Sequence, residues 1–256
     1  MRVLAIIAKL SFAAVLVSAV IGAIAAFGTR FGIWDYNFGL LTLFPWCLYF
    51  GIAAFALGAA WAIGALIGNV GVATRYGAIG LVGSILIAGP PLYRLYVARQ
   101  LPAIHDISTD TENPPQFVAL KNDRPGATNP SSYDGPLLAK GPEGETEATW
   151  KLQKKYYSDL RATSELMPPD KLFRHAVKTA YAMGWNVVAV DPKDGRIEAT
   201  DTSFWFGLTD DIVIRVKPAG QGARLDIRSK SRVGVSDYGE NADRINAYRK
   251  ALSASY

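Results

Sequence analysis

The chain has 256 residues, a formal net charge of +5 and a hydrophobic content of 50%, which suits one membrane unit and one ordinary domain. Residues 1–100 contain six basic side chains and one acidic one, whereas the remainder contains 21 of each sign. A phosphate-binding footprint needs a basic excess on the soluble domain, so we set aside nucleic-acid partners. The single cysteine, Cys47, excludes a disulfide within the chain and a metal site built on cysteines.

Three apolar stretches in the first 100 residues are long enough to cross a bilayer. A spanning helix needs about 20 apolar residues, because each adds about 1.5 Å and the hydrocarbon core is about 30 Å thick. Runs without a charge cover 10–29, 38–74 and 76–93, and the middle run is too short for two spans and a turn. The sequence therefore predicts a membrane anchor over 1–100, with helices at about 10–29, 40–67 and 76–93. The first stretch has a cleaved signal peptide as its alternative interpretation.

The orientation of the anchor rests on a small difference in basic residues. Three spans place the chain ends on opposite sides, and the lysine and arginine counts on the two sides are equal. Arg2 and Lys9 precede the first helix, whereas Arg30 behind it is partly offset by Asp35. We therefore expect a multi-pass protein of the inner (cytoplasmic) membrane, with a cytoplasmic N-terminus and a periplasmic soluble domain.

Residues 101–147 form an acidic segment rich in proline. The segment holds seven of the 14 prolines, eight acidic residues and three basic ones, a composition that favours extended, irregular chain. Residues 148–256 carry 18 basic and 13 acidic side chains. The segment is therefore expected either to lie along this basic module through opposite charge or to be a solvated linker.

Residues 148–256 are expected to fold as a soluble α+β domain. Apolar positions recur at helical spacing between Pro168 and Gly184, and β-rich runs cover 185–190, 196–202, 204–217 and 223–233. Asp237 stands three residues before Glu240, as in a cap for a helix over 242–254. The order helix, four mainly antiparallel strands, helix predicts a two-layer sandwich that follows a three-helix transmembrane bundle.

The last expected strand carries the candidate polar site. Five charged residues alternate onto one of its faces, namely Arg224, Asp226, Arg228, Lys230 and Arg232. One hypothesis is an anion or carboxylate site, and the alternative is a cross-strand salt-bridge ladder with a helix cap. The candidate binding cluster comprises Arg228, Ser229, Ser231, Arg232, Asp210, Asp211, Asp237, Asn241 and Arg244.

Catalytic signatures are sparse. His105 lies beside Asp106 and near Asp110, and these three are secondary candidates for a hydrolase-like site, whereas His175 is expected to be a surface or half-buried residue of a helix. The sequence has no Walker loop and no dinucleotide fingerprint. We therefore assign no catalytic residue and expect no cofactor and no metal site.

Several motifs resemble those of a known family. They are His105-Asp-Ile-Ser-Thr-Asp110 with Pro114-Pro115, Thr209-Asp-Asp-Ile-Val-Ile-Arg215, Asp226-Ile-Arg-Ser-Lys-Ser-Arg-Val-Gly-Val-Ser-Asp237, Asn241 and Arg244-Ile245. Over about 101–252 the chain resembles the bacterial and plastid family that shares domain of unknown function 1499, here in a membrane-anchored form. The family has no established activity, and its single-domain members in photosynthetic lineages are associated with the thylakoid lumen. The resemblance marks the motif positions as the ones to test, with Asp106 and Asp110 added to the polar cluster.

Three functional hypotheses follow from these features. The first is a non-catalytic, membrane-tethered domain that binds a partner protein, an envelope component or a lipid headgroup. The second is a hydrolase-like enzyme that uses His105 with nearby acids. The third is a structural subunit of a membrane assembly, in which the helical bundle matters more than the domain.

Overall fold

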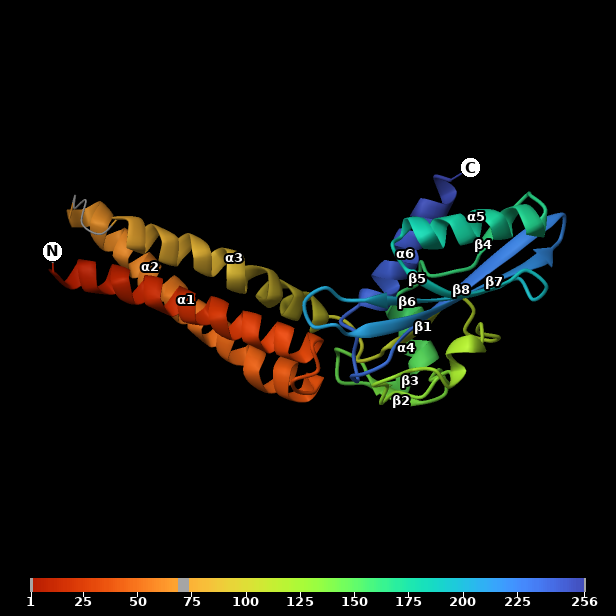
Figure 1. Ribbon diagram of the computed structural model, residues 1–256, viewed down its shortest axis with the longest axis horizontal. Coiled ribbons are helices and arrows are strands. Elements are labelled where there is room, and N and C mark those ends of the chain that lie inside the picture. Colours follow the sequence, from red (N-terminus) through yellow and green to blue (C-terminus); the bar gives the residue numbers. More distant parts are fainter. Residues whose placement is uncertain (1, 69–73, 256) are drawn as a thin grey trace. The chain divides into compact units, whose positions relative to one another are not determined.

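The computed structural model describes residues 2–68 and 74–255, and the chain separates into two compact units (Figure 1). The helical unit consists of Met1–Tyr96 together with the short segment Ser203–Gly207. The α+β unit consists of Val97–Thr202 and Leu208–Tyr256.

The helical unit has a helix at each of the three predicted spans. They are α1 (Arg2–Arg30), α2 (Phe44–Gly68), which a π-helical segment (Asn37–Leu43) precedes, and α3 (Thr74–Ala98). All three are long and apolar enough to cross a membrane. The helices extend beyond the predicted spans because a run without charges marks the hydrocarbon-embedded part, whereas the helix continues into the interface. The stretch 68–75 between the second and third predicted helices lies largely outside the described residues.

Small residues allow the helices of the bundle to approach closely. A Cβ atom at Gly58 would lie 2.9 Å from the Cα of Leu81 on α3. The hydroxyl groups of Ser11 and Ser18 on α1 each donate to a carbonyl oxygen of α2, those of Ala54 and Cys47, at 2.7 Å. Close backbone approach and interhelical hydrogen bonds are the usual means by which apolar helices associate in lipid.

The α+β unit is built on an antiparallel sheet with the strand order β1-β8-β7-β6-β5, in which β4 also pairs with β8. The strands are β1 (Asp106–Ser108), β4 (Thr163–Glu165), β5 (Asn186–Asp191), β6 (Arg196–Thr202), β7 (Thr209–Ala219) and β8 (Gly222–Ser231). The α+β class, the antiparallel strands and the C-terminal helix are confirmed. The third predicted strand begins at Thr209 rather than at residue 204, because Ser203–Gly207 leaves the sheet.

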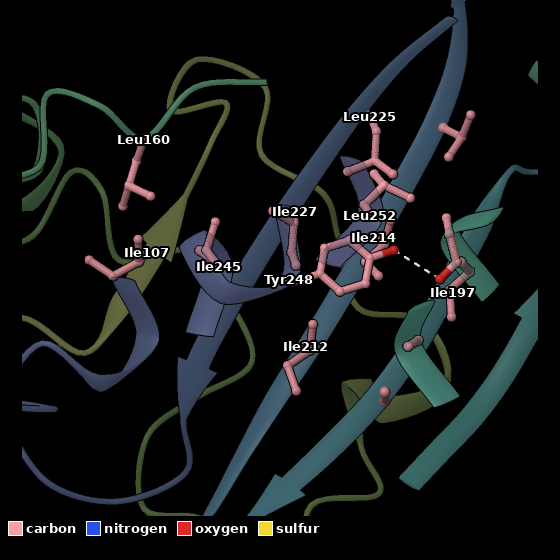
Figure 2. Close-up of a cluster of buried hydrophobic side chains, with 14 of the residues drawn as sticks. Ile107, Leu160, Ile197, Ile212, Ile214, Leu225, Ile227, Ile245, Tyr248 and Leu252 are labelled. Carbon is pink, nitrogen blue, oxygen red and sulfur yellow. Dashed lines mark hydrogen bonds between the residues drawn. The ribbon is translucent and has the colours of Figure 1, made fainter. Parts of the chain in front are cut away.

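Two helices cover one face of the sheet and enclose the main core. They are α5 (Pro169–Ala182) and α6 (Glu240–Ser253). Figure 2 shows the side chains of Ile245, Tyr248 and Leu252 from α6 among the isoleucine and leucine side chains of the strands. The Tyr248 hydroxyl donates to the carbonyl oxygen of Ala176 on α5 at 2.9 Å, which joins the two helices inside the core.

The opposite face of the sheet is covered by residues 109–137, which we call the arm. The arm includes a short 3-10 helix (Ala119–Lys121) and leads to the hairpin of β2 (Leu138–Lys140) and β3 (Thr146–Ala148) and then to α4 (Thr149–Tyr156). Phe117 and Leu120 of the arm form a second buried cluster with Val213 of β7. Of the two expectations for this acidic segment, the structure therefore has the packed one rather than the solvated linker.

Candidate functional site

The charged face of β8 lies beneath the arm. Arg228 and Lys230 are fully buried, and Arg232 is 7% exposed. Burying a cation without a partner is very costly, so each must be paired and hydrogen-bonded. The partners come largely from β1, the arm and β7, which makes this face a set of enclosed ion pairs.

Arg228 is held on every side. Its Nε and Nη2 atoms donate to the two carboxylate oxygens of Asp106 on β1, both at 2.8 Å. The same guanidinium donates to the carbonyl oxygens of Ser131 and Ser132 in the arm. Its Cζ atom lies 4.9 Å from the ring centroid of Phe117 and 5.3 Å from that of Tyr133. The arm therefore stabilises Arg228 through both cation–π contacts and hydrogen bonds.

Lys230 lies between the carboxylates of Asp106 and Asp134, and Asp134 in turn contacts His105. Its Nζ atom lies 2.6 Å from Asp134 Oδ2 and 3.3 Å from Asp106 Oδ2, and it donates to the carbonyl oxygen of Ser132 at 2.7 Å. His105 Nε2 lies 3.0 Å from the same Oδ2 atom of Asp134. Burial raises the pKa of the Asp134 carboxyl, but the interactions with His105 and Lys230 outweigh burial and hold that pKa below its usual value.

Three more acidic residues, two on this face and one in the arm, have arginine partners. Asp211 of β7 accepts from Arg232 Nη2 at 2.7 Å and from the arm residue Arg124. Asp226 of β8 pairs with Arg215 across the strands at 3.0 Å. Asp110 in the arm is bound by the arginines at 215 and 224, at 3.1 and 3.0 Å. The structure thus has the cross-strand salt-bridge ladder that was one of the two expectations.

Glu198 of β6 is a buried residue that the sequence reasoning missed. Its carboxylate accepts hydrogen bonds from the backbone N–H groups of Val118, Ala119 and Leu120 at 2.8–3.0 Å, and Arg196 pairs with it from the same strand. The signal in the sequence was the alternation Arg196, Glu198, Thr200 on β6, which places an acid on the arm side of the sheet. The carboxylate fastens the 3-10 turn of the arm to the sheet.

The rest of the predicted polar cluster lies on the helix-covered face. Ser229 donates to Asn241 Oδ1 at 2.5 Å, and the Asn241 side chain in turn donates to Ser231 at 3.0 Å. Arg244 of α6 pairs with Asp210 at 2.7 Å and with Asp201 at 2.9 Å. The backbone N–H groups of Gly239 and Asn241 donate to the Asp237 carboxylate. The N-cap residue of α6 is nevertheless Gly239 rather than the predicted Asp237, and the helix begins at Glu240 rather than at residue 242.

The structure therefore brings the predicted cluster together only in two separate groups. Arg228, Arg232 and Asp211 lie on the arm side of the sheet, whereas Ser229 and Ser231 of β8 meet Asn241 and Arg244 of α6 on the opposite side. Side chains of neighbouring strand residues point to opposite faces, so one ligand cannot contact both groups. His105 meets Asp134 rather than Asp110. Whether either group binds a ligand stays a prediction.

A groove lies on the helix-covered side, between α5 and the ends of β5 and β7. It has a volume of about 930 Å³. Its apolar floor includes Phe173 and Val177 of α5 and Val216 of β7, with Pro192 and Pro218 at the strand ends. Its rim carries four cations and two carboxylates, namely Arg174, Lys178, Lys193, Lys217, Asp170 and Asp194. The rim is therefore positively charged over an apolar floor.

Comparison with family models identifies the soluble part. The model for the protein of unknown function DUF1499 matches residues 106–252. The chain belongs to the DUF1499 family. The DUF1499 match begins at Asp106, so it covers β1 and the arm as well as the sheet and its helices.

Other comparisons add little to the family assignment. No curated protein matches the chain. Among solved structures, the DUF1499 protein is similar to the one titled "Crystal structure of Ara h 8.0201", with 12% sequence identity and a TM-score of 0.29. That similarity covers 37% of this chain and 93% of the other.

Proposed function

We propose that this DUF1499 protein is a membrane-anchored binding protein without catalytic activity, and that the groove between α5 and β7 takes a single-chain anionic lipid. The observation that carries the proposal is the combination of an apolar floor and a basic rim in that groove. Ligand sites are usually concave and mostly apolar, with a few polar groups that orient the ligand.

The floor suits an acyl chain. Phe173 and Val216 are 7% and 5% exposed, so they form a firm base, while Val177 and Val190 remain partly accessible on the two sides of the groove. Removing apolar surface from water contributes roughly 25 cal/mol per Å². A chain laid between α5 and the strand ends would therefore gain free energy along its length.

The rim suits a carboxylate head. Lys178 and Lys193 are exposed and make no salt bridge within the described residues, whereas Arg174 is paired with Asp170 at 2.7 Å. Lysine acts as a mobile point charge for an anion. The enclosed arginines at 228 and 232 then have a structural task in this proposal, which is to hold the arm on the sheet.

The test uses the full-length protein in phosphatidylcholine nanodiscs. A palmitate analogue with a diazirine on its chain is added, irradiated and mapped by mass spectrometry. We expect labelled peptides from α5 and β7 in addition to the membrane helices. The double variant Lys178→Glu/Lys193→Glu should lower groove labelling at least tenfold, because two attractive charges become repulsive. Lys121→Glu/Lys140→Glu makes the same charge change at two exposed sites outside the groove and should leave labelling unchanged.

The other outcomes are equally definite. Absence of label from α5 and β7 would overturn the groove as a lipid site. Equal labelling of the double variant, or equal labelling by the uncharged hexadecanol analogue, would overturn the anionic head. Labelling by a photoreactive phosphatidylglycerol but not by the fatty acid would overturn the single chain. Labelling of the membrane helices serves as the internal reference in every sample.

We also propose that the soluble domain lies on the periplasmic side of the inner membrane. The proposal rests on the two basic residues before the first helix, Arg2 and Lys9. A compartment-sensitive reporter fused to each terminus tests it. A C-terminal reporter that is active in the cytoplasm would overturn this orientation.

A further inference from the structure

The connection between β6 and β7 has an unusual composition for a loop. Between Thr202 and Thr209 the chain runs Ser203, Phe204-Trp205-Phe206, Gly207. Loops between strands normally carry small and polar residues. Here three aromatic residues follow one another, and Phe204 and Trp205 are 66% and 60% exposed. Exposing two large aromatic side chains to water is unfavourable, so we look for a surface against which these rings are buried.

This aromatic loop groups with the helical unit rather than with the sheet. Within that unit, the ring centroids of Phe204 and Trp205 lie 6.5 and 5.9 Å from that of Phe27 in the last turn of α1. The ring of Phe206 lies 5.3 Å from that of Phe44 at the start of α2. The three aromatic residues therefore lie at the level at which one apolar helix ends and the next begins.

Arg30 and Gly207 fix the backbone of the loop at that level. Arg30 Nη1, at the end of α1, donates to the carbonyl oxygens of Ser203 and Phe204 at 2.9 and 2.6 Å. Gly207 has φ +66°, and a Cβ atom there would lie 3.1 Å from the Cα of Arg30. A side chain at this position would thus force the loop away from the helix end.

We propose that the aromatic loop Phe204–Phe206 inserts into the headgroup layer of the bilayer beside the C-terminal end of α1. Phe27 belongs to a helix apolar enough to cross a membrane, and Arg30 is the first charge after its apolar run, so the interface lies between them. Aromatic rings favour this depth, where the ring is apolar and the surroundings are partly wet. The partner surface is lipid. The loop would thus attach the protein to the membrane at a second place, in addition to the three helices.

The proposal is tested by measuring depth at single sites. Cys47, the one native cysteine, is replaced by serine, and spin labels are attached at Phe204→Cys or Trp205→Cys in proteoliposomes of full-length protein. Collisions with oxygen, which concentrates in lipid, and with a water-soluble nickel complex are compared. Tyr181→Cys on α5 is the control, because the exposed fraction of Tyr181, 59%, is close to the 60% of Trp205. We expect an oxygen-to-nickel ratio at 204 and 205 at least fivefold above the control.

Each result bears on the proposal. High oxygen access with low nickel access at both loop sites supports insertion into lipid. High nickel access, equal to that at the control site, would mean that the loop lies in water and would overturn the proposal. Low access to both reagents would mean that the rings pack only against protein, which also overturns it. The unlabelled Cys47→Ser protein must unfold at the same temperature as the natural one.

Discussion

Arg228 and Asp106 form a two-point ion pair inside the α+β unit, with Nε–Oδ1 and Nη2–Oδ2 distances of 2.8 Å and no exposed surface on either side chain. The pair joins β8 to β1, and its two residues are 122 positions apart in the chain. Because the guanidinium also binds arm carbonyls and contacts two arm rings, it fastens the arm to the sheet.

Removal of this arginine should be strongly destabilising. Arg228→Ala leaves the Asp106 charge buried without its main partner, and we expect the free energy of unfolding to fall by about 3–5 kcal/mol. Arg174→Ala breaks the exposed pair with Asp170 and should cost less than about 1 kcal/mol. Urea titration of the full-length protein in detergent, followed by near-ultraviolet circular dichroism, measures both.

A double variant isolates the interaction energy between Arg228 and Asp106 from the other contacts of each residue. Arg228→Ala/Asp106→Ala removes both charges, so we expect it to lose less stability than the sum of the single variants. Equal costs for Arg228→Ala and Arg174→Ala, or full additivity in the cycle, would contradict the role given to this ion pair.

Glu198 should control the attachment of the arm. Its carboxylate accepts from three consecutive backbone N–H groups, and hydrogen bonds to a charged group each contribute about 1.5–3 kcal/mol. In Glu198→Ala we expect the amides of residues 118–120 to exchange with deuterium at least about 30-fold faster, which corresponds to about 2 kcal/mol. Glu198→Gln keeps one acceptor oxygen, so its exchange rates should lie between those of the natural protein and those of Glu198→Ala. Glu147→Ala, at an exposed position on β3, is the control, and unchanged exchange in Glu198→Ala would refute the attachment.

Regular patterns in the sequence predicted most of the sheet and its helices. The bounds of β6 were predicted at 196–202 because apolar residues alternate there with polar ones, and the helix after Pro168 was predicted from its spacing. The strands β1 and β4 have three residues each, which is too few to show an alternation. They form only because β8 offers its edge groups to chain that is distant in sequence.

The candidate site was predictable in its faces but not in its partners. Alternation correctly placed Arg228 and Ser229 on opposite sides of β8, yet charge and polarity alone grouped them as one cluster. Ion-pair partners such as Asp134 and Lys230 lie on irregular chain and on a strand, and no periodic pattern joins them. The groove between α5 and β7 likewise depends on how a helix lies over strand ends, which local sequence does not encode.

The pH dependence of stability should report on Asp134. Its folded-state pKa is below its usual value. In the pH range of these two pKa values the unfolded state therefore binds more protons than the folded state, so the stability rises with pH. The contribution is present at neutral pH and is lost as the pH falls through the unfolded and then the folded pKa. Unfolding free energies of the natural protein and of Asp134→Asn should therefore differ at pH 6 and converge towards pH 2. Parallel curves would show that the carboxylate carries no such linkage.

The bundle should respond to one added methyl group according to where the glycine lies. A Cβ atom at Gly58 would lie 2.9 Å from Leu81 Cα and 3.0 Å from its N atom, whereas one at Gly89 would meet nothing nearer than 3.9 Å. Alanine is favoured over glycine in a helix by about 1 kcal/mol, so Gly89→Ala should stabilise or leave the bundle unchanged. Gly58→Ala must push two backbones apart, and overpacking costs about 1–3 kcal/mol. Titration with sodium dodecyl sulfate in mixed micelles, followed by helical circular dichroism, measures the free energy of unfolding of the bundle. Gly58→Ala should lower it, whereas Gly89→Ala should raise it or leave it unchanged. Because both substitutions are chemically identical, equal shifts would mean that α2 and α3 do not approach at Gly58 in the membrane-like environment.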